Sequence, residues 1–171
     1  MGRFKVYSAI GLGKIMGQAT FGGGCFWKIE DRFSTIPGVL KTSVGYMGGH
    51  YANPCYLDVV SRITGHAEVA QVEFDPELVS YSALLNSFWA MHDPTSWYRQ
   101  GADSGEQYRS VIFYHTPEQR QLSERNKQQL DQSGTYEKPI AHSQGSTPDR
   151  NRLDDGSTSL EHWLNRVKIR N

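Results

Sequence analysis

Cysteine is scarce in this chain, since Cys25 and Cys55 are the only two among 171 residues. Two thiols are too few for the disulfide scaffold of a small secreted protein, and they favour a reducing cytoplasm. An excess of charge is also lacking, because 18 Lys and Arg residues balance 18 Asp and Glu residues. Balanced charge argues against nucleic acid and anionic membrane surfaces as partners, and no apolar run is long enough to span a bilayer.

Motifs for nucleotide binding are missing as well. There is no P-loop and no strand-linked G-x-G-x-x-G, and Gly22–Gly24 lead into Cys25 and aromatic residues rather than the phosphate-binding Lys and Ser or Thr. The N-terminal Arg3 and Lys5 precede an apolar segment that is short and broken by Lys14, so we expect no signal peptide. The length suits one domain with an adequate core.

The stretch around Cys25 organises what is present. A short strand is predicted over 18–24, and a helix over 25–36 follows from apolar residues at helical spacing. A thiol at a helix N-terminus faces free N–H groups and the positive end of the helix dipole, which favour the nucleophilic thiolate. A buried structural cysteine is the alternative, and local spacing leaves both open.

The remaining chain predicts alternating strands and helices. A second strand over 40–46 follows the first helix, which indicates a β-α-β unit. We expect loops over 48–56 and 92–105 and a surface helix that begins at Thr116-Pro117. We also expect strands at 69–74, 108–114 and 138–142, and helices that begin after Ser80 and after Thr158.

Glu68 stands out in the strand pattern. It shares the apolar face of its strand with Ala70, Val72 and Phe74, so its carboxyl is expected to point towards the core. Desolvation raises the pKa of a carboxyl group and can leave it as a neutral acid near pH 7. The alternative is a solvated residue at the frayed start of the strand.

Two familiar kinds of site fit the sequence poorly. Zinc could be bound by Cys25, Cys55, His50 and His66, but these residues lack the close ligand pairs of structural zinc sites. A cysteine hydrolase would use Cys25 with His50, His66 or His92 as its base. With six histidines in the chain, such a pairing arises easily by chance.

A third arrangement fits better. Cys25 lies beside two large aromatic residues, with a shielded acid and three tyrosines (Tyr46, Tyr56 and Tyr108) that can donate hydrogen bonds. Aromatic side chains bind an apolar methyl or thioether group, and a neutral acid and phenols hold a polar oxygen. The side chain of methionine sulfoxide has both features.

Seven motifs then carry a family resemblance, in this order: Gly24-Cys25-Phe26-Trp27, Gly45-Tyr46-x-Gly48-Gly49, Asn53-Pro54-x-Tyr56, Thr64-Gly65-His66-Ala67-Glu68, Phe74-Asp75-Pro76, His92-Asp93-Pro94-Thr95 and Arg99-Gln100-Gly101-x-Asp103-x-Gly105-x-Gln107-Tyr108-Arg109-Ser110. Together they resemble peptide methionine sulfoxide reductase of type A, which acts on the S epimer, and the match covers about residues 18–120. The resemblance implies a two-layer α/β sandwich with a mixed central sheet, β-α-β units, a ferredoxin-like core and a long C-terminal coil.

The resemblance also implies roles for particular residues. Cys25 would attack the sulfoxide sulfur, and Glu68 would protonate or hydrogen-bond the sulfoxide oxygen. Five side chains would bind the substrate: Tyr56 and Tyr108 at the oxygen, Phe26 and Trp27 around the methyl group, and Asp103 on the polar side. No metal or organic cofactor is implied, and thioredoxin or another thiol would reduce the oxidised Cys25. We expect one monomeric domain over 1–171, with residues 1–17 as a lead-in.

Some parts depart from the family pattern. No cysteine follows Cys55, although many members keep resolving cysteines near the C-terminus, and residues 121–171 match poorly. Ser96-Trp97-Tyr98 and Ala102 also differ from the residues that the family usually has at these positions. We expect an external thiol to resolve the Cys25 sulfenic acid, with Cys55 as the other possible resolving thiol. A non-catalytic module that binds methionine sulfoxide remains the alternative to an enzyme.

Overall fold

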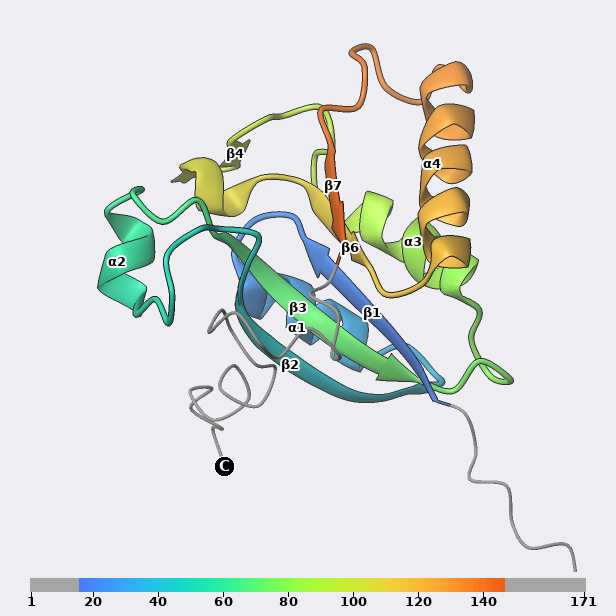
Figure 1. Ribbon diagram of the computed structural model, residues 1–171. Helices are drawn as coiled ribbons and strands as arrows, with labels where there is room; N and C mark the ends of the chain where they lie inside the picture. Colours follow the sequence, from blue (N-terminus) through green and yellow to red (C-terminus); the bar gives the residue numbers. More distant parts are fainter. Residues whose placement is uncertain (1–15, 147–171) are drawn as a thin grey trace, which may run out of the picture.

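The computed structural model describes residues 16–146 (Figure 1). Its elements follow in the order β1 (Gly17–Gly22), α1 (Phe26–Ser34), β2 (Val39–Met47), α2 (Tyr56–Val60), β3 (Ala67–Phe74), α3 (Tyr81–Met91), β4 (Arg99–Gln100), β5 (Asp103–Ser104), the 3₁₀ turn η1 (Glu106–Tyr108), β6 (Val111–Tyr114), α4 (Pro117–Gln132) and β7 (Ser143–Ser146). Among these residues, no helix is long and apolar enough to cross a membrane.

Five strands form one mixed sheet in the order β2-β3-β1-β6-β7, and β4 pairs with β5 as a separate hairpin. Strand β3 runs antiparallel to both β1 and β2, so β1 and β2 run in the same direction. The predicted β-α-β unit is therefore confirmed, with β3 inserted between its two strands. The pair β6 and β7 is parallel, which makes the sheet mixed.

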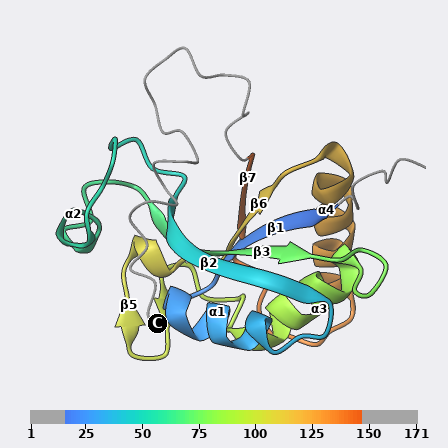
Figure 2. The same ribbon diagram turned by 90° about the horizontal axis from the view of Figure 1, so that it is seen from below.

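Helices α1 and α3 cover one face of the sheet (Figure 2), and the main core lies between them and the strands. Phe21 of β1 stacks on Phe33 of α1 at 4.9 Å and on Phe88 of α3 at 5.0 Å between ring centroids. Helix α4 buries only Gln119 and Ser123, so its predicted place at the surface is confirmed. The layers match the expected α/β sandwich.

The structure corrects the boundaries of several predicted segments. Residues 108–114 are not a strand throughout, because Tyr108 ends η1 and β6 begins at Val111. The strand expected over 138–142 starts at Ser143 instead, since the backbone N–H groups of Ile140 and Ala141 bond to Asp131 Oδ1 and to the carbonyl of Pro94. The loop at 92–105 contains the β4–β5 hairpin, and the loop at 48–56 ends where α2 begins.

The expected helix after Thr158 lies outside the described residues. The helix after Ser80 is confirmed as α3, with the Ser80 hydroxyl accepting a hydrogen bond from the N–H of Ala83. Thr116 caps α4 in the same way through the N–H of Gln119. Both caps satisfy N–H groups that have no partner within the helix.

Candidate active site

Three glycines bring Cys25 into close contact with other parts of the fold. A Cβ atom on Gly22 would lie 2.7 Å from the carbonyl oxygen of Glu68, and one on Gly23 would lie 2.9 Å from Cγ of the His92 ring. Gly24 has φ +108°, a backbone conformation that L side chains rarely adopt. The turn therefore requires glycine, because larger residues would push Cys25 away from β3 and His92.

Cys25 is the N-cap residue of α1, as the helical spacing predicts. Its carbonyl accepts hydrogen bonds from the N–H groups of Lys28 and Ile29, and its side chain makes no capping bond. The thiol is partly exposed and is not in a disulfide. The sulfur therefore lies at the end of α1 where the first backbone N–H groups have no partner within the helix.

Glu68 lies beside this helix start. Its side chain is 4% exposed, and Oε2 accepts a hydrogen bond of 3.1 Å from the backbone N–H of Phe26, the residue after Cys25. Burial raises the pKa of Glu68 to about 7; the charge of Asp103 acts in the same direction, and the Phe26 hydrogen bond opposes it. The predicted core-facing orientation is confirmed, and the carboxyl can donate a proton near neutral pH.

Tyr46 is opposite Glu68, because the register of β2 and β3 pairs these two residues. Burial, followed by the charge of Glu68, raises the pKa of Tyr46 well above its ordinary value. The pKa of Tyr108 is raised by burial and by the charges of Glu68 and Asp103. Both phenols therefore keep their protons and can donate hydrogen bonds next to Glu68.

Aromatic rings border the apolar side of the site. Phe26 is buried, with its ring centroid 5.0 Å from that of Trp27 and 5.6 Å from that of Tyr46. Trp27 is 49% exposed and Tyr56 is 60% exposed. The rings thus range from an enclosed base at Phe26 to an open rim at Trp27 and Tyr56.

The β4–β5 hairpin closes another side. Asp103 in β5 accepts a hydrogen bond from Lys28 Nζ of α1 at 3.2 Å. Gln100 in β4 uses its side-chain amide twice, accepting from the N–H of Asp93 and donating to its carbonyl, at 2.9 and 2.7 Å. A Cβ atom on Gly24 would lie 3.0 Å from Cβ of Gln100, so the hairpin packs directly on the turn before Cys25.

Cys55 is exposed and is the N-cap residue of α2. Its backbone N–H donates to Asp58 Oδ2 at 2.7 Å, and hydrogen bonds from the thiol and this N–H lower the pKa of Asp58. Cys55 directly precedes Tyr56, the first residue of α2, so the second thiol lies beside the exposed rim of the site. Neither cysteine is in a disulfide.

Two of the histidines considered as a hydrolase base are engaged elsewhere. His66 Nδ1 accepts from the N–H of Gly49, and Nε2 donates to the carbonyl of Tyr51. His92 bonds through one ring nitrogen to the carbonyl of Phe88 and through the other to the hydroxyl of Ser110. Burial lowers the pKa of His92 to about 4, so it stays neutral. Both imidazoles serve as internal supports.

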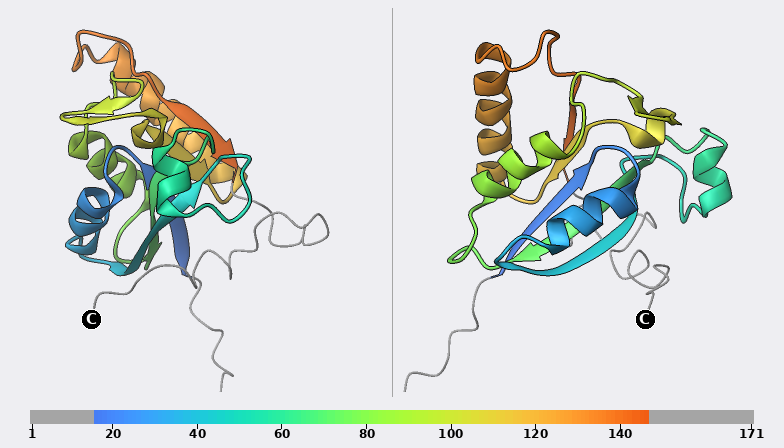
Figure 3. Two further views of the ribbon diagram at one scale, coloured as in Figure 1. Left: turned by 90° about the vertical axis from the view of Figure 1, so that its left-hand side faces the viewer. Right: turned by 180° about the vertical axis from the view of Figure 1, so that it is seen from behind.

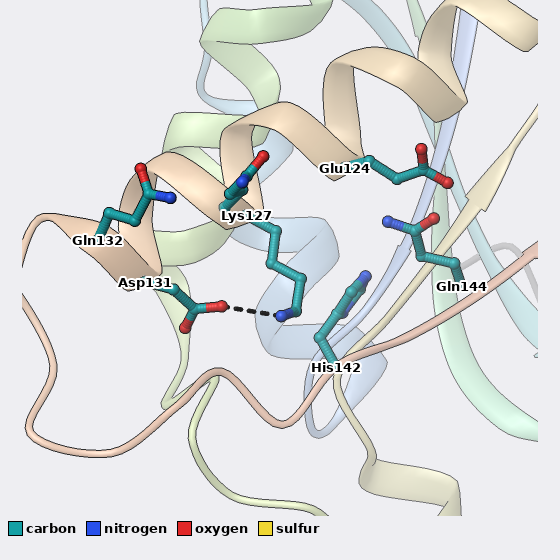
Figure 4. A pocket seen from close by; sticks show the side chains of 7 residues that line it. Glu124, Lys127, Asp131, Gln132, His142 and Gln144 are labelled. Atoms are coloured by element: carbon teal, nitrogen blue, oxygen red, sulfur yellow. Dashed lines mark hydrogen bonds and ion pairs between the residues drawn. The ribbon is translucent and has the colours of Figure 1, made fainter.

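Zinc binding is the other chemistry for which the cysteines and histidines were candidates. Within the described part of the chain, no group of three His, Cys, Asp or Glu side chains could hold a metal ion. A pocket of about 470 Å³ lies between α4 and β7 (Figure 4), and its lining includes Lys127, Asp131 and His142. It contains neither cysteine and none of the expected site residues.

Comparison with known proteins identifies the family. The sequence model described as "Peptide methionine sulfoxide reductase" matches residues 17–147. The chain belongs to the peptide methionine sulfoxide reductase family. This match reaches beyond residue 120, where the motif resemblance ends.

Individual relatives agree with this assignment. Peptide methionine sulfoxide reductase MsrA 1 of Nostoc is 59% identical over 125 residues, which are 73% of this chain and 77% of that protein. The solved structure of reduced Mxr1 from Saccharomyces cerevisiae has a TM-score of 0.70 and 27% identity, covering 77% of this chain and 75% of that one. Mxr1 in complex with Trx2 has a TM-score of 0.58 and 20% identity over 82% and 84% of the chains, and this shows the fold alone.

The enzyme class follows from the family. Peptide methionine sulfoxide reductases are oxidoreductases that act on sulfur groups, and the methionine sulfoxide reductase activity expected from the motifs is confirmed at this level. The structure brings Glu68, Phe26, Tyr46 and Tyr108 together around the start of α1. Tyr56 and Trp27 lie at the exposed rim.

Sequence patterns do not locate several residues that shape the reductase site. Tyr46 is one of the three tyrosines expected to donate hydrogen bonds, and it is the pairing of β2 with β3 that places it opposite Glu68. Lys28, which bonds to Asp103, lies one helical turn after Cys25, and that spacing alone places it near Cys25 on α1. The supports from His92 and Gln100 have no local signal, because they arrive from distant segments.

Proposed function

We propose that the protein reduces the S epimer of peptide-bound methionine sulfoxide, with Cys25 as the nucleophile and Glu68 as the acid. The observation that carries this proposal is the buried Glu68 carboxyl, which has a pKa of about 7 and is bonded to the N–H that follows Cys25. A carboxyl kept neutral near pH 7 suits protonation of a developing oxyanion.

The step is balanced in atoms and electrons. The Cys25 thiolate attacks the sulfoxide sulfur and forms an S–S bond while Glu68 protonates the oxygen. The hydroxyl then moves to Cys25, so a new S–O bond forms on the Cys25 sulfur as the substrate S–O bond and the transient S–S bond break, giving a sulfenic acid and methionine. The substrate sulfur gains two electrons and the Cys25 sulfur loses two. Glu68 recovers its proton from water.

The remaining residues support the proposed binding mode. Phenols that keep their protons, Tyr108 and Tyr46, can donate to the sulfoxide oxygen. Phe26 and Trp27 can enclose the methyl group, since sulfur and methyl groups pack favourably on aromatic rings. Asp103 acts on the polar side through Lys28 and through the charge that it adds near Glu68. Tyr56 would contribute at the exposed rim.

For regeneration we propose thioredoxin or another external thiol. The thiol attacks the Cys25 sulfenic acid, water leaves, and a second thiol reduces the resulting disulfide. Support comes from the chemistry of sulfenic acids and from the partial exposure of Cys25. The Trx2 complex of Mxr1 concerns that yeast protein.

Cys55 is the second candidate for resolving Cys25. It is an exposed free thiol that directly precedes Tyr56, and bridging would need the two Cα atoms within about 7 Å. Thiol titration after one turnover separates the two routes. Loss of one thiol supports the external route, whereas loss of both as an intramolecular disulfide supports Cys55.

Single-turnover reduction of both epimers of a methionine sulfoxide peptide, without added reductant, tests the proposed reaction. Wild type should give about one methionine per enzyme from the S epimer alone, and Cys25→Ser should give none. Cys55→Ser is the matched control and should keep the first turnover. Binding without product in folded wild type would favour a non-catalytic module, and acylation of Cys25 by esters would favour a hydrolase.

We also propose that the chain is a single monomeric domain that works in the cytoplasm. The family match over residues 17–147 supports a single domain, and the scarcity of cysteine supports a reducing cytoplasm. Limited proteolysis, sedimentation and cell fractionation test the three parts separately. A stable cleavage intermediate, a dimer at micromolar concentration, or recovery outside the cytoplasm would each contradict the corresponding part.

A further inference from the structure

A buried set of hydrogen bonds lies behind the turn that precedes Cys25. The ring of His92 bonds through Nδ1 to the carbonyl oxygen of Phe88 and through Nε2 to the hydroxyl of Ser110, both at 2.8 Å. The same hydroxyl oxygen lies 3.1 Å from Nδ1 of His142. We refer to His92, Ser110 and His142 as the buried network. Its members come from the end of α3, the start of β6 and the segment before β7.

The position of each proton in the buried network follows from its partners. Burial lowers the pKa of His142 to about 3, and His92 is neutral as well, so each ring has one N–H donor and one acceptor nitrogen. The carbonyl of Phe88 can only accept, so the proton of His92 is on Nδ1 and its Nε2 accepts from Ser110. The oxygen of Ser110 then accepts from His142, whose proton is therefore also on Nδ1.

Solvent offers no substitute for the Ser110 hydroxyl. Ser110 is 1% exposed, so no other donor from the solvent reaches Nε2 of His92. At the far end, Nε2 of His142 is buried beside the pocket between α4 and β7 (Figure 4) and has no hydrogen-bond partner among the described residues. A buried N–H without an acceptor is rare in proteins, which again places the proton of His142 on Nδ1.

The His92 ring supports the turn before the nucleophile. It packs against Gly23, where a Cβ atom would lie 2.9 Å from Cγ of the ring. Val111, the residue after Ser110, pairs with Gly22 in the sheet. In the right-hand view of Figure 3, the end of α3 lies beside the loop that joins β1 to α1. The orientation of the ring, which Ser110 selects, therefore limits where the backbone of the turn can lie.

This placement bears on the proposed reaction. Cys25 comes directly after the turn, whereas Glu68 is held in β3, so a shift of the turn changes the distance between the thiol and the acid. A misplacement of about 1 Å can lower a rate by about 100-fold. We propose that Ser110 is a positioning residue: by fixing the His92 ring, it holds the turn where Cys25 reaches the sulfoxide sulfur. This inference rests on the proposed function and adds a supporting residue to the same site.

Single-turnover reduction of the S epimer of a methionine sulfoxide peptide, over a range of peptide concentrations, tests the inference. Ser110→Ala removes the donor to His92 and should lower the rate constant at saturation by about tenfold, for a shift of the turn smaller than 1 Å. The peptide concentration at half-saturation should change by less than about twofold, because Ser110 is enclosed and does not face the peptide.

Ser123→Ala is the matched control. Ser123 is fully buried like Ser110, but it lies in α4 and its hydroxyl bonds to that of Tyr81 at 3.0 Å. Both substitutions remove a buried, hydrogen-bonded hydroxyl and should lower the melting temperature. Only Ser110→Ala should slow the reaction, whereas Ser123→Ala should stay within about twofold of wild type. The pair thus separates positioning of Cys25 from a general loss of stability.

The ring protons give a second measurement that does not depend on activity. Long-range ¹H–¹⁵N spectra of protein labelled with ¹⁵N-histidine show which nitrogen of each ring carries the proton, and His142→Phe assigns the signals of His142. Wild type at pH 7 should have His92 and His142 both protonated on Nδ1. In Ser110→Ala the Nδ1 proton of His142 loses its acceptor, so this ring should no longer keep a single tautomer.

Several outcomes would overturn the inference. A proton on Nε2 of His92 or His142 in wild type would show that the buried network does not have the proposed polarity. An unchanged rate constant in Ser110→Ala, or an equal loss in Ser123→Ala, would exclude a positioning role for Ser110. A loss that appears only as a higher half-saturating concentration would assign Ser110 to peptide binding. Failure of wild type to form methionine would contradict the proposed function itself, and the role of Ser110 with it.

Discussion

Replacing Glu68 by Gln should make the protein more stable at alkaline pH while removing its activity. The carboxyl has an ordinary pKa of 4.5 and a pKa of about 7 in the fold, with burial as the main cause. Ionised Glu68 is therefore disfavoured in the folded state relative to the unfolded chain. Glutamine has nearly the same shape and can still accept the hydrogen bond from Phe26 through its carbonyl oxygen.

The sign and size of this stability difference between Glu68→Gln and wild type follow from proton linkage. Because the pKa of Glu68 is higher in the folded state, the stabilising contribution of its carboxyl is fully present below its pKa in the unfolded chain. That contribution is lost as the pH rises through its pKa in the folded protein. The difference between 4.5 and about 7 corresponds to about 3 kcal/mol at pH 8.5, at about 1.4 kcal/mol per pH unit. Glu68→Gln should thus gain about 3 kcal/mol relative to wild type at pH 8.5 and close to nothing at pH 4.

Urea denaturation of wild type and variant at pH 4, 6, 7 and 8.5 measures this difference. Glu73→Gln is the control, because Glu73 lies on the same strand but is 36% exposed and paired with Lys41. The difference in unfolding free energy between Glu73→Gln and wild type should vary by no more than about 0.5 kcal/mol across the four pH values. A Glu68→Gln difference that is independent of pH would refute the assignment of a raised pKa.

The same substitution tests catalysis. Loss of a positioned general acid typically lowers the rate by about 10²–10⁴-fold, so single-turnover reduction by Glu68→Gln should fall by that factor at pH 6.5. In wild type the protonated fraction of Glu68 falls above pH 7, so the rate should decline by about tenfold per pH unit there. A variant as fast as wild type would rule out Glu68 as the acid.

Three further substitutions probe the surroundings of the site and the fold. Asp103→Asn removes a charge that raises the pKa of Glu68, so the alkaline limb of the single-turnover pH profile should move to lower pH; an unmoved limb would contradict this coupling. Gly23→Ala places a Cβ 2.9 Å from the His92 ring and should cost about 1–3 kcal/mol in urea denaturation, unless the ring can move aside. Thr116→Ala removes the α4 cap and should lower the unfolding free energy by about 1 kcal/mol, with unchanged single-turnover rates; a neutral effect would mean that water replaces the cap.

The sequence by itself determined the local elements near the site. Period-two and helical spacing identified β2, β3, α1 and α3, because these patterns reflect burial of one face. The three glycines before Cys25 lack side chains, and the His92 ring and the carbonyl of Glu68 in β3 lie where Cβ atoms on Gly23 and Gly22 would be crowded. Ordered motifs along the chain also identified the family, which residues 17–147 match.

Only the tertiary structure decided which distant residues meet. The register of β2 on β3 placed Tyr46 opposite Glu68, and the β4–β5 hairpin brought Gln100 and Asp103 to the start of α1. The expected strand at 138–142 failed for the same reason, since Asp131 and the carbonyl of Pro94 took its N–H groups. Local propensity is set within a few residues, whereas the pKa of Glu68 depends on burial that the whole chain creates.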